Sequence, residues 1–237
     1  MKIVLGWAFW WHDWASTFLA KHLFGVKRCI LIVAHLSLFG FFFPEMRKDF
    51  GELAGNLLIV ILFLSPISKI LRMRLLLQAM SLRRELGITM AYLATVHGVG
   101  FLLDPEWFAL FIAPYWRDDF LAIDPAYLFG MGAYVLTLPL LLTSNSLAQR
   151  FLGSKWKLLH RLVYALFVLA IFHRFLVRGG ADIGEVFQVT FLLASYALAK
   201  ILAWKNFLPT LQKSIDWVAL QYKEYTIARK EAAPPVV

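Results

Sequence analysis

Three histidines lie inside long apolar stretches of this 237-residue sequence. His97 lies in ITMAYLATVHGVGFLL, and His160 and His173 lie in LLHRLVYALFVLAIFHRF. An ionisable side chain within a membrane segment is costly, so it indicates a functional site by default. Neutral imidazole is a common metal ligand, and two imidazoles from facing helices can bind a haem iron from both sides. The residues therefore predict a b-type haem site, provided that the stretches around them are membrane helices.

The composition is that of a membrane protein. Charged residues make up 16% of the chain and hydrophobic residues 60%, whereas an average soluble domain has about 25% charged residues. The net charge of +9 raises nucleic acid as a partner, but no nucleic-acid motif is present and the basic residues cluster in loops that suit anionic lipid. We therefore expect membrane lipid and no nucleic acid as a partner. The single cysteine, Cys29, excludes an internal disulfide and a cysteine-based metal site.

Six stretches are long and apolar enough to approach the requirement of about 20 residues for a spanning helix. They cover residues 29–43, 52–67, 86–103, 126–143, 158–177 and 186–204. The segment before them, residues 1–28, is rich in Trp and Phe, which favour the membrane interface. We expect it to be a helix lying on the membrane surface, with a seventh span as the alternative. The predicted fold is an all-α membrane protein: a six-helix bundle at 29–204 with an N-terminal interfacial helix and a cytosolic tail at 205–237.

Prolines mark the expected edges of the spans, where they break no interior hydrogen bond. These are Pro44, Pro66, Pro105 and Pro125, whereas Pro139 falls inside the fourth span and is expected to kink it.

The placement of charge predicts the orientation of the bundle. If the six spans alternate in direction, most of the basic residues in the links fall on the same side of the membrane. These are Lys27, Arg28, Lys69, Arg72, Arg74, Arg83, Arg84, Arg150, Lys155, Lys157 and Lys205. The other side holds mostly acidic residues, among them Asp104, Asp118, Asp119 and Asp124. The positive-inside rule then places both termini in the cytosol. The long link between the third and fourth spans lies outside, and its apolar centre predicts that it folds back over the outer face.

In this topology the third and fifth spans run in the same direction, so the depths of their histidines can be compared. His97 lies ten residues past Gly87, about 15 Å deep, and His173 lies eleven residues past Leu162, about 17 Å deep. Both fall near the middle of a hydrocarbon core about 30 Å thick. This favours ligation of one haem by the pair. The alternative is a histidine pair bonded to backbone or to each other, gating a proton path.

Small residues around His97 agree with either interpretation. Ala94, Gly98 and Gly100 would leave room for a flat macrocycle, but small residues serve close helix packing equally well.

His160 is a further candidate ligand, near the cytosolic boundary and three residues after Lys157. It lies 13 residues before His173, which is about 140° off a common helical stripe. The third span has no second histidine at the matching depth, so the pattern favours one well-defined haem. His35 in the first span is an unusual partner for His160, or else a histidine bonded inside the bundle.

Two arginines beside the histidines are candidates for binding haem propionates, because guanidinium groups bind carboxylates bidentately. Arg174 follows His173, and Arg161 follows His160. The alternative for Arg161 and for Arg178 is contact with lipid headgroups.

Three motifs resemble a known family: GELAGNLLIVILFLSPISK, SLRRELGITMAYLATVHG, and LLLTSNSLAQRFLGSKWKLLHRLVYALFVLAIFHRF. Together they are similar to the ferric-reductase-like transmembrane domain, and most similar to its MsrQ (YedZ) type of haem-binding membrane subunit. The resemblance runs from about residue 51 to residue 178. It implies a bundle in a bacterial inner membrane that holds haem b between its third and fifth helices, with His97, His160 and His173 as ligands.

The resemblance also implies partners. Electrons would come from a separate cytosolic flavin reductase or from quinol, and would pass to a periplasmic reductase that repairs methionine sulfoxide. It raises FMN as a second cofactor.

The predicted function is therefore that of an oxidoreductase component, a haem b protein that moves electrons across the membrane. Two other classes stay open at this point: a cofactor-free transporter with a histidine proton relay, and a structural subunit of a membrane complex. The transporter is disfavoured because the sequence shows no inverted repeat and no paired broken helices.

Overall fold

The computed structural model describes residues 2–114, 122–179, 183–204 and 220. These residues form helices and their connections, and no strand occurs among them. Six helical segments are long and apolar enough to cross a membrane: Trp10–Phe42, Pro44–Leu71, Arg74–Leu102, Pro125–Leu142, Ser154–Val177 and Val186–Trp204. The predicted all-α, six-span fold is therefore confirmed, and the protein is a multi-pass membrane protein.

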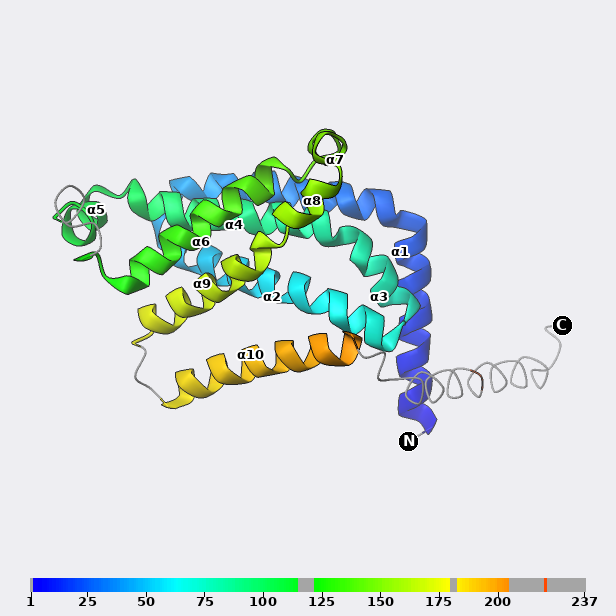
Figure 1. The fold of residues 1–237 in the computed structure, drawn as a ribbon. Helices are drawn as coiled ribbons and strands as arrows, with labels where there is room; N and C mark the ends of the chain where they lie inside the picture. The colour runs from blue at the N-terminus through cyan, green and yellow to red at the C-terminus, as the bar shows by residue number, and fades with distance from the viewer. Residues whose placement is uncertain (1, 115–121, 180–182, 205–219, 221–237) are drawn as a thin grey trace. The chain divides into compact units, whose positions relative to one another are not determined.

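The helices follow one another along the chain as shown in Figure 1. The long ones are α1 (Lys2–Ser37), α2 (Arg47–Leu71), α4 (Arg83–Leu102), α6 (Pro125–Leu142), α9 (Leu162–Val177) and α10 (Ile183–Trp204). The short α-helices are α3 (Arg74–Ala79), α5 (Pro105–Phe111), α7 (Ser146–Leu152) and α8 (Ser154–Leu159). Three 3-10 turns connect them: η1 (Leu38–Phe42), η2 (Pro44–Met46) and η3 (Met80–Leu82).

The chain divides into two compact units. The larger comprises residues 27–62 and 82–196, and the other comprises residues 1–26, 63–81 and 197–237. In the larger unit α6 packs against both α4 and α9 (Figure 1). The first part of α2 joins their core, which consists of Ala54, Leu58, Ile61, Leu62, Met90, Leu93, Ala133, Leu140, Leu166, Phe167 and Ile171. The three histidines of the apolar stretches belong to the larger unit: His97 to α4, His173 to α9, and His160 to the link between α8 and α9.

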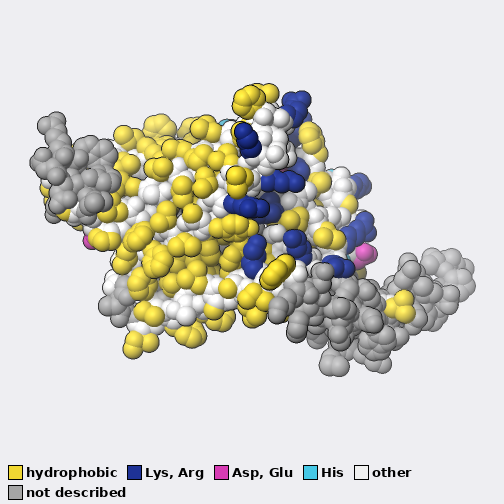
Figure 2. Space-filling view, in the orientation of Figure 1, with side chains coloured by type: hydrophobic (Ala, Val, Ile, Leu, Met, Phe, Trp, Pro, Cys, Tyr) yellow, Lys and Arg dark blue, Asp and Glu magenta, His cyan; other side chains and the backbone are white. Residues whose placement is uncertain are grey.

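The two ends of the larger unit differ in charge. At one end, which we call the basic end, α4 begins and α6 ends, and α7 and α8 follow; its basic residues are Arg83, Arg84, Arg150, Lys155 and Lys157. Figure 2 shows Lys and Arg side chains gathered over this region. The opposite end, which we call the α5 end, carries α5 and the carboxylates Asp104 and Asp124 at its helix starts. This asymmetry is the one on which the predicted orientation rests, and the orientation itself stays a prediction.

Three of the expected proline edges are correct and one is wrong. Pro44, Pro105 and Pro125 are each the first residue of a helix. Pro66, in contrast, is fully buried inside α2, which continues to Leu71. Proline is tolerated inside membrane helices because neighbouring groups satisfy the freed backbone. Pro139 lies inside α6 as expected.

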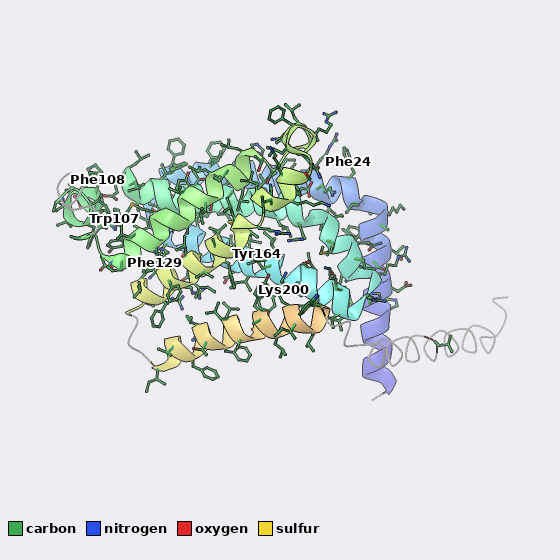
Figure 3. The ribbon with its side chains drawn as sticks, in the orientation of Figure 1. Phe24, Trp107, Phe108, Phe129, Tyr164 and Lys200 are labelled. Carbon is green, nitrogen blue, oxygen red and sulfur yellow. The ribbon has the colours of Figure 1, made fainter. Side chains whose placement is uncertain are left out.

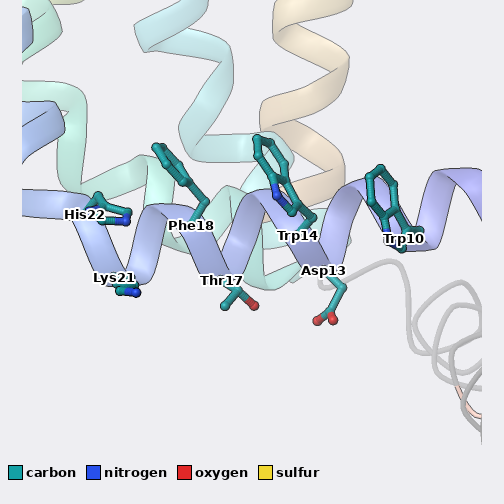
Figure 4. Close-up of a pocket in the computed structure, with 7 residues that line it drawn as sticks. All are labelled: Trp10, Asp13, Trp14, Thr17, Phe18, Lys21 and His22. Carbon is teal, nitrogen blue, oxygen red and sulfur yellow. The ribbon is translucent and has the colours of Figure 1, made fainter. Parts of the chain in front are cut away.

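The N-terminal segment is helical, but it is not separated from the first span. α1 runs from Lys2 to Ser37 with one irregular residue, His22, whose φ of −113° and ψ of 15° mark a kink. A shallow groove follows one face of α1 before this kink (Figure 4), lined by Trp10, Asp13, Trp14, Thr17, Phe18, Lys21 and His22. An aromatic stripe beside a polar one suits an interfacial helix, and that location stays a prediction.

Two predicted segments fall largely outside the described residues. They are the centre of the link between the third and fourth spans, at residues 115–121, and the C-terminal tail, of which only Leu220 is described.

Candidate haem site

His97 of α4 and His173 of α9 face each other in the larger unit. Their ring centroids are 6.0 Å apart and their planes lie at 62° to one another. The two histidines lie at matching heights, five residues before the end of α4 and four before the end of α9. Within the spans Arg74–Leu102 and Ser154–Val177 both histidines lie closer to the α5 end than to mid-span, because these spans begin well before Gly87 and Leu162, from which the depths were predicted.

Each of the two imidazoles is fixed by a backbone carbonyl. His97 Nδ1 lies 2.9 Å from the carbonyl oxygen of Arg47, and His173 Nδ1 lies 2.7 Å from that of Ala126. A carbonyl oxygen can only accept a hydrogen bond, so each Nδ1 carries the proton and each Nε2 keeps a free lone pair. No hydrogen bond to either Nε2 occurs within the described part of the chain. Metal-binding histidines are typically held in this way.

A glycine one turn after the accepting carbonyl makes room for each of the two imidazole rings. Gly51 lies four residues after Arg47 on α2, and Gly130 lies four residues after Ala126 on α6. A Cβ atom at Gly51 would lie 2.5 Å from His97 Nδ1, and one at Gly130 would lie 2.8 Å from His173 Nδ1. Each glycine therefore leaves the space through which an imidazole reaches the carbonyl one turn away.

The pair fits the axial ligands of a haem. Metal–imidazole bonds of about 2 Å each put the two ligand nitrogens about 4 Å apart. Ring centroids lie behind their nitrogens, so a centroid separation of 6.0 Å is compatible with that distance. Within residues 2–114, 122–179 and 183–204, no group of three or more His, Cys, Asp or Glu could hold a bare metal ion. Two imidazoles alone suffice for haem because the porphyrin supplies the other ligands.

Arg47 is a site residue that the sequence did not reveal. Its side chain is 12% exposed, and its Nη1 donates to Asp104 Oδ2 at 2.7 Å. Its buried Nε has no hydrogen-bond partner among the described residues. This unsatisfied guanidinium N–H lies against Gly100, about one turn after His97 on α4, and it suits a carboxylate such as a haem propionate. Nothing in the charged run PEMRKDF distinguishes this arginine from Lys48.

Asp104 connects Arg47 to the start of α5. Its Oδ1 accepts from the backbone N–H groups of Glu106 and Trp107, both at 3.1 Å, while Oδ2 accepts from Arg47. The hydrogen bond from Trp107 and the one from Arg47 hold the pKa of Asp104 below its ordinary value of 3.8. The ionised carboxylate is therefore the form that caps α5.

The two predicted propionate arginines lie at opposite ends of α9. Arg174 Nη1 lies 3.5 Å from Asn56 Oδ1, and Arg178 forms an ion pair with Glu52 at 2.8 Å, so the last turn of α9 reaches α2. Arg161 precedes α9. It lies 12 residues from His173 along the chain, which is about 18 Å along a helix. Of these two arginines, only Arg174 is therefore close enough to serve a group held by His97 and His173.

His160 has a different environment from the facing pair. Its Nε2 lies 3.0 Å from Thr143 Oγ1, and its ring stacks on Trp156 with centroids 4.0 Å apart. The Thr143 hydroxyl donates its proton to the Pro139 carbonyl at 2.6 Å, so it accepts from His160. His160 Nε2 is therefore protonated, and Nδ1 is the nitrogen left for a metal.

Other predicted neighbours of the site lie elsewhere. A Cβ at Gly98 would meet Tyr134 and one at Gly100 would meet Arg47, so these glycines contact side chains rather than leaving open room. His35 is exposed, with its Nδ1 2.7 Å from the Leu31 carbonyl and its ring against Tyr92. It has no recorded contact with His160.

Residues 50–171, which include Gly51, His97 and Gly130, match the family of ferric reductase like transmembrane components. The chain belongs to this family. Its relatives include three heme-binding subunits MsrQ of protein-methionine-sulfoxide reductase. The one from Agrobacterium fabrum is 31% identical over 65% of this chain and 70% of the relative. The one from Azospira oryzae is 36% identical over 54% and 52%. The one from Cronobacter sakazakii is 30% identical over 65% and 80%.

The resemblance seen in the sequence motifs is thus confirmed at the level of the family. No solved structure matches the chain significantly.

Proposed function

We propose that this protein is a membrane electron-transfer subunit that binds haem b between His97 and His173. The observation that carries the proposal is the facing of two imidazoles whose protons are held at Nδ1 by backbone carbonyls, with both Nε2 lone pairs free. The names of the relatives, heme-binding subunits, support the same cofactor. When bound, haem supplies one-electron redox chemistry that no side chain of the protein can supply.

The protein's own groups have distinct tasks in this proposal. The carbonyls of Arg47 and Ala126 orient the two imidazoles and select their tautomers. The side chains of Arg47 and Arg174 would hold the propionates, because Arg47 has an unsatisfied buried N–H and Arg174 directly follows His173. The apolar core of α2, α4, α6 and α9 excludes water and lowers the local dielectric.

Electrons would enter at the basic end, from a cytosolic flavin reductase or from quinol, and leave at the α5 end for a redox partner on the outer side. By the positive-inside rule the basic end faces the bacterial cytosol, where both termini would also lie. A cytosolic donor would therefore meet the basic end, and the acceptor would meet the α5 end. The names of the relatives, as subunits of a reductase, support a separate partner. FMN gains no support from those names or from the described contacts.

The rival histidine relay is less compatible with the geometry. A relay must pass protons through both ring nitrogens, but each Nδ1–H ends on a backbone carbonyl that carries no exchangeable proton. A second haem at the basic end would use His160 through its Nδ1, with Arg161 nearby in sequence, but no other imidazole among the described residues contacts the His160 ring, so the proposal has one haem.

The test is a reduced-minus-oxidised absorbance spectrum of the purified protein, with haem quantitation. We expect b-type bands, one haem per chain, and loss of both in His97→Ala and in His173→Ala. His35→Ala is the matched control, because His35 is exposed and bonded to its own helix. Absence of haem from the wild-type protein, or its full retention in both variants, would refute the proposal.

A further inference from the structure

A continuous series of aromatic rings leads from His97 to the surface of the α5 end. His97 contacts Phe101 with ring centroids 5.3 Å apart, and Phe101 contacts Trp107 at 5.6 Å. Trp107 in turn contacts Phe111 at 5.6 Å and Tyr127 at 5.0 Å. Each separation lies within the range of about 4.5–7 Å typical of aromatic pairs in contact. Phe111 is 40% exposed, so the series ends at the surface.

The position of Trp107 in this series is fixed by the same network that holds His97. Arg47 accepts from the His97 ring through its carbonyl and binds Asp104 through its guanidinium. Asp104 caps α5 by accepting from the backbone N–H of Trp107. Figure 3 shows Trp107 on α5, at the same end of the larger unit as Phe129 of α6. One arginine therefore positions both the ligand imidazole and the ring of Trp107.

We propose that Phe101 and Trp107 form the route by which electrons leave the haem site toward an acceptor at the α5 end, where the next ring, Phe111, is exposed. This rests on the function proposed above. One electron crosses in each event: the reduced haem loses it and a one-electron acceptor at the α5 end gains it. No bond forms or breaks, and no proton needs to move. Electron tunnelling slows steeply as the distance between donor and acceptor grows. Aromatic rings in contact shorten the remaining distance between the haem site and an acceptor at the surface.

A second aromatic pair at this end provides a contrast. Phe129 and Phe172 stack at 5.6 Å between α6 and α9. This pair has no recorded ring contact with His97 or His173, and Phe172 is 39% exposed. If aromatic residues here served only as an interfacial belt, substitutions in the two clusters would have equivalent effects.

The experiment measures single electron transfers without catalytic turnover. The purified protein is reduced with a limited amount of dithionite and mixed in a stopped-flow instrument with ferricyanide or with a soluble blue-copper protein. The reoxidation rate is followed at the haem bands. The variants are Trp107→Leu, which removes the ring, Trp107→Phe, which keeps one, and Phe101→Leu. Phe129→Leu is the matched control. The absorbance spectrum and the midpoint potential of each variant are measured separately.

We expect Trp107→Leu and Phe101→Leu to slow reoxidation several-fold, most strongly with the copper protein, at an unchanged spectrum and potential. Trp107→Phe and Phe129→Leu should stay near the wild-type rate. Equal rates in wild type and Trp107→Leu would overturn the proposal, and so would equal slowing by Phe129→Leu. If Trp107→Leu loses haem, the rate of Phe101→Leu compared with that of Phe129→Leu decides. A wild-type protein without haem would instead contradict the proposed function.

Discussion

The two ends of the larger unit treat their histidines differently. Near the α5 end, His97 and His173 each donate from Nδ1 to a main-chain carbonyl across a glycine, which leaves Nε2 free. At the basic end, His160 donates from Nε2 to the Thr143 hydroxyl and stacks on Trp156. The contrast shows that the partner of an imidazole, more than its depth in the membrane, determines which nitrogen is available to a metal. We expect the two environments to respond to mutation in opposite ways.

The largest contrast is between two alanine substitutions 13 residues apart. His173→Ala should abolish haem binding, whereas His160→Ala should retain one haem per chain with an unchanged reduced spectrum, because His160 is not paired with a facing imidazole. Haem quantitation and the spectrum of each variant provide the measurement. Loss of haem from both variants would mean that the basic end holds a ligand as important as the facing pair.

The glycines that admit the imidazoles give the next effect. Gly51→Ala and Gly130→Ala place a methyl group 2.5 Å and 2.8 Å from a ring nitrogen, which forces the ring off its carbonyl. Disturbing such supporting contacts typically weakens metal binding about 10- to 100-fold. Titration of haemin into the apoprotein measures the change. Gly55→Ala is the control, because a Cβ there meets nothing within 4 Å. Equal haemin affinity in Gly51→Ala and Gly55→Ala would show that the close approach is unimportant.

A smaller effect is expected at the basic end. Thr143→Val removes the acceptor of His160 Nε2 and leaves a half-buried N–H without its partner, at a cost of about 1–3 kcal/mol in the free energy of unfolding. Chemical unfolding in detergent measures this change, and the haem spectrum should not move. The neighbouring Ser144→Ala should cost less, because the Ser144 hydroxyl donates only to the Leu140 carbonyl near the end of α6. A shifted haem spectrum in Thr143→Val would place His160 in the haem site after all.

The smallest effect should come from Asp104. Because its pKa is lowered in the folded protein, ionised Asp104 stabilises the fold above its ordinary pKa of 3.8, and this stabilisation is lost as the pH falls through the lower folded value. Asp104→Asn should therefore lower the melting temperature slightly at neutral pH, and the difference from wild type should shrink as the pH falls below 3.8 and through the lower folded value. Glu106→Gln, two residues along, is the control. A difference that persists at low pH would contradict the assignment.

Much of the fold, but less of the site, was predictable from the sequence. Apolar runs indicated six spans, and a helical rise of 1.5 Å per residue placed His97 and His173 at one height. The apolar runs did not reveal where helices begin, since α4 starts in the charged pair Arg83–Arg84 and α2 continues through Pro66. Nor did they reveal Gly51 or Arg47, because a glycine that admits a ring and one that faces empty space look alike in a single sequence.

The acceptors that orient the two imidazoles belong to the main chain. Every amino acid carries the same carbonyl, so replacing the side chain at position 47 or 126 cannot delete the acceptor, although it can remove a guanidinium or add bulk. What can misalign the histidines is a rotation or slip of α2 or α6 along its axis. The orientation of the two imidazoles therefore depends on the register of α2 and α6. Mutations that loosen the packing of these two helices would disturb that orientation without changing either histidine.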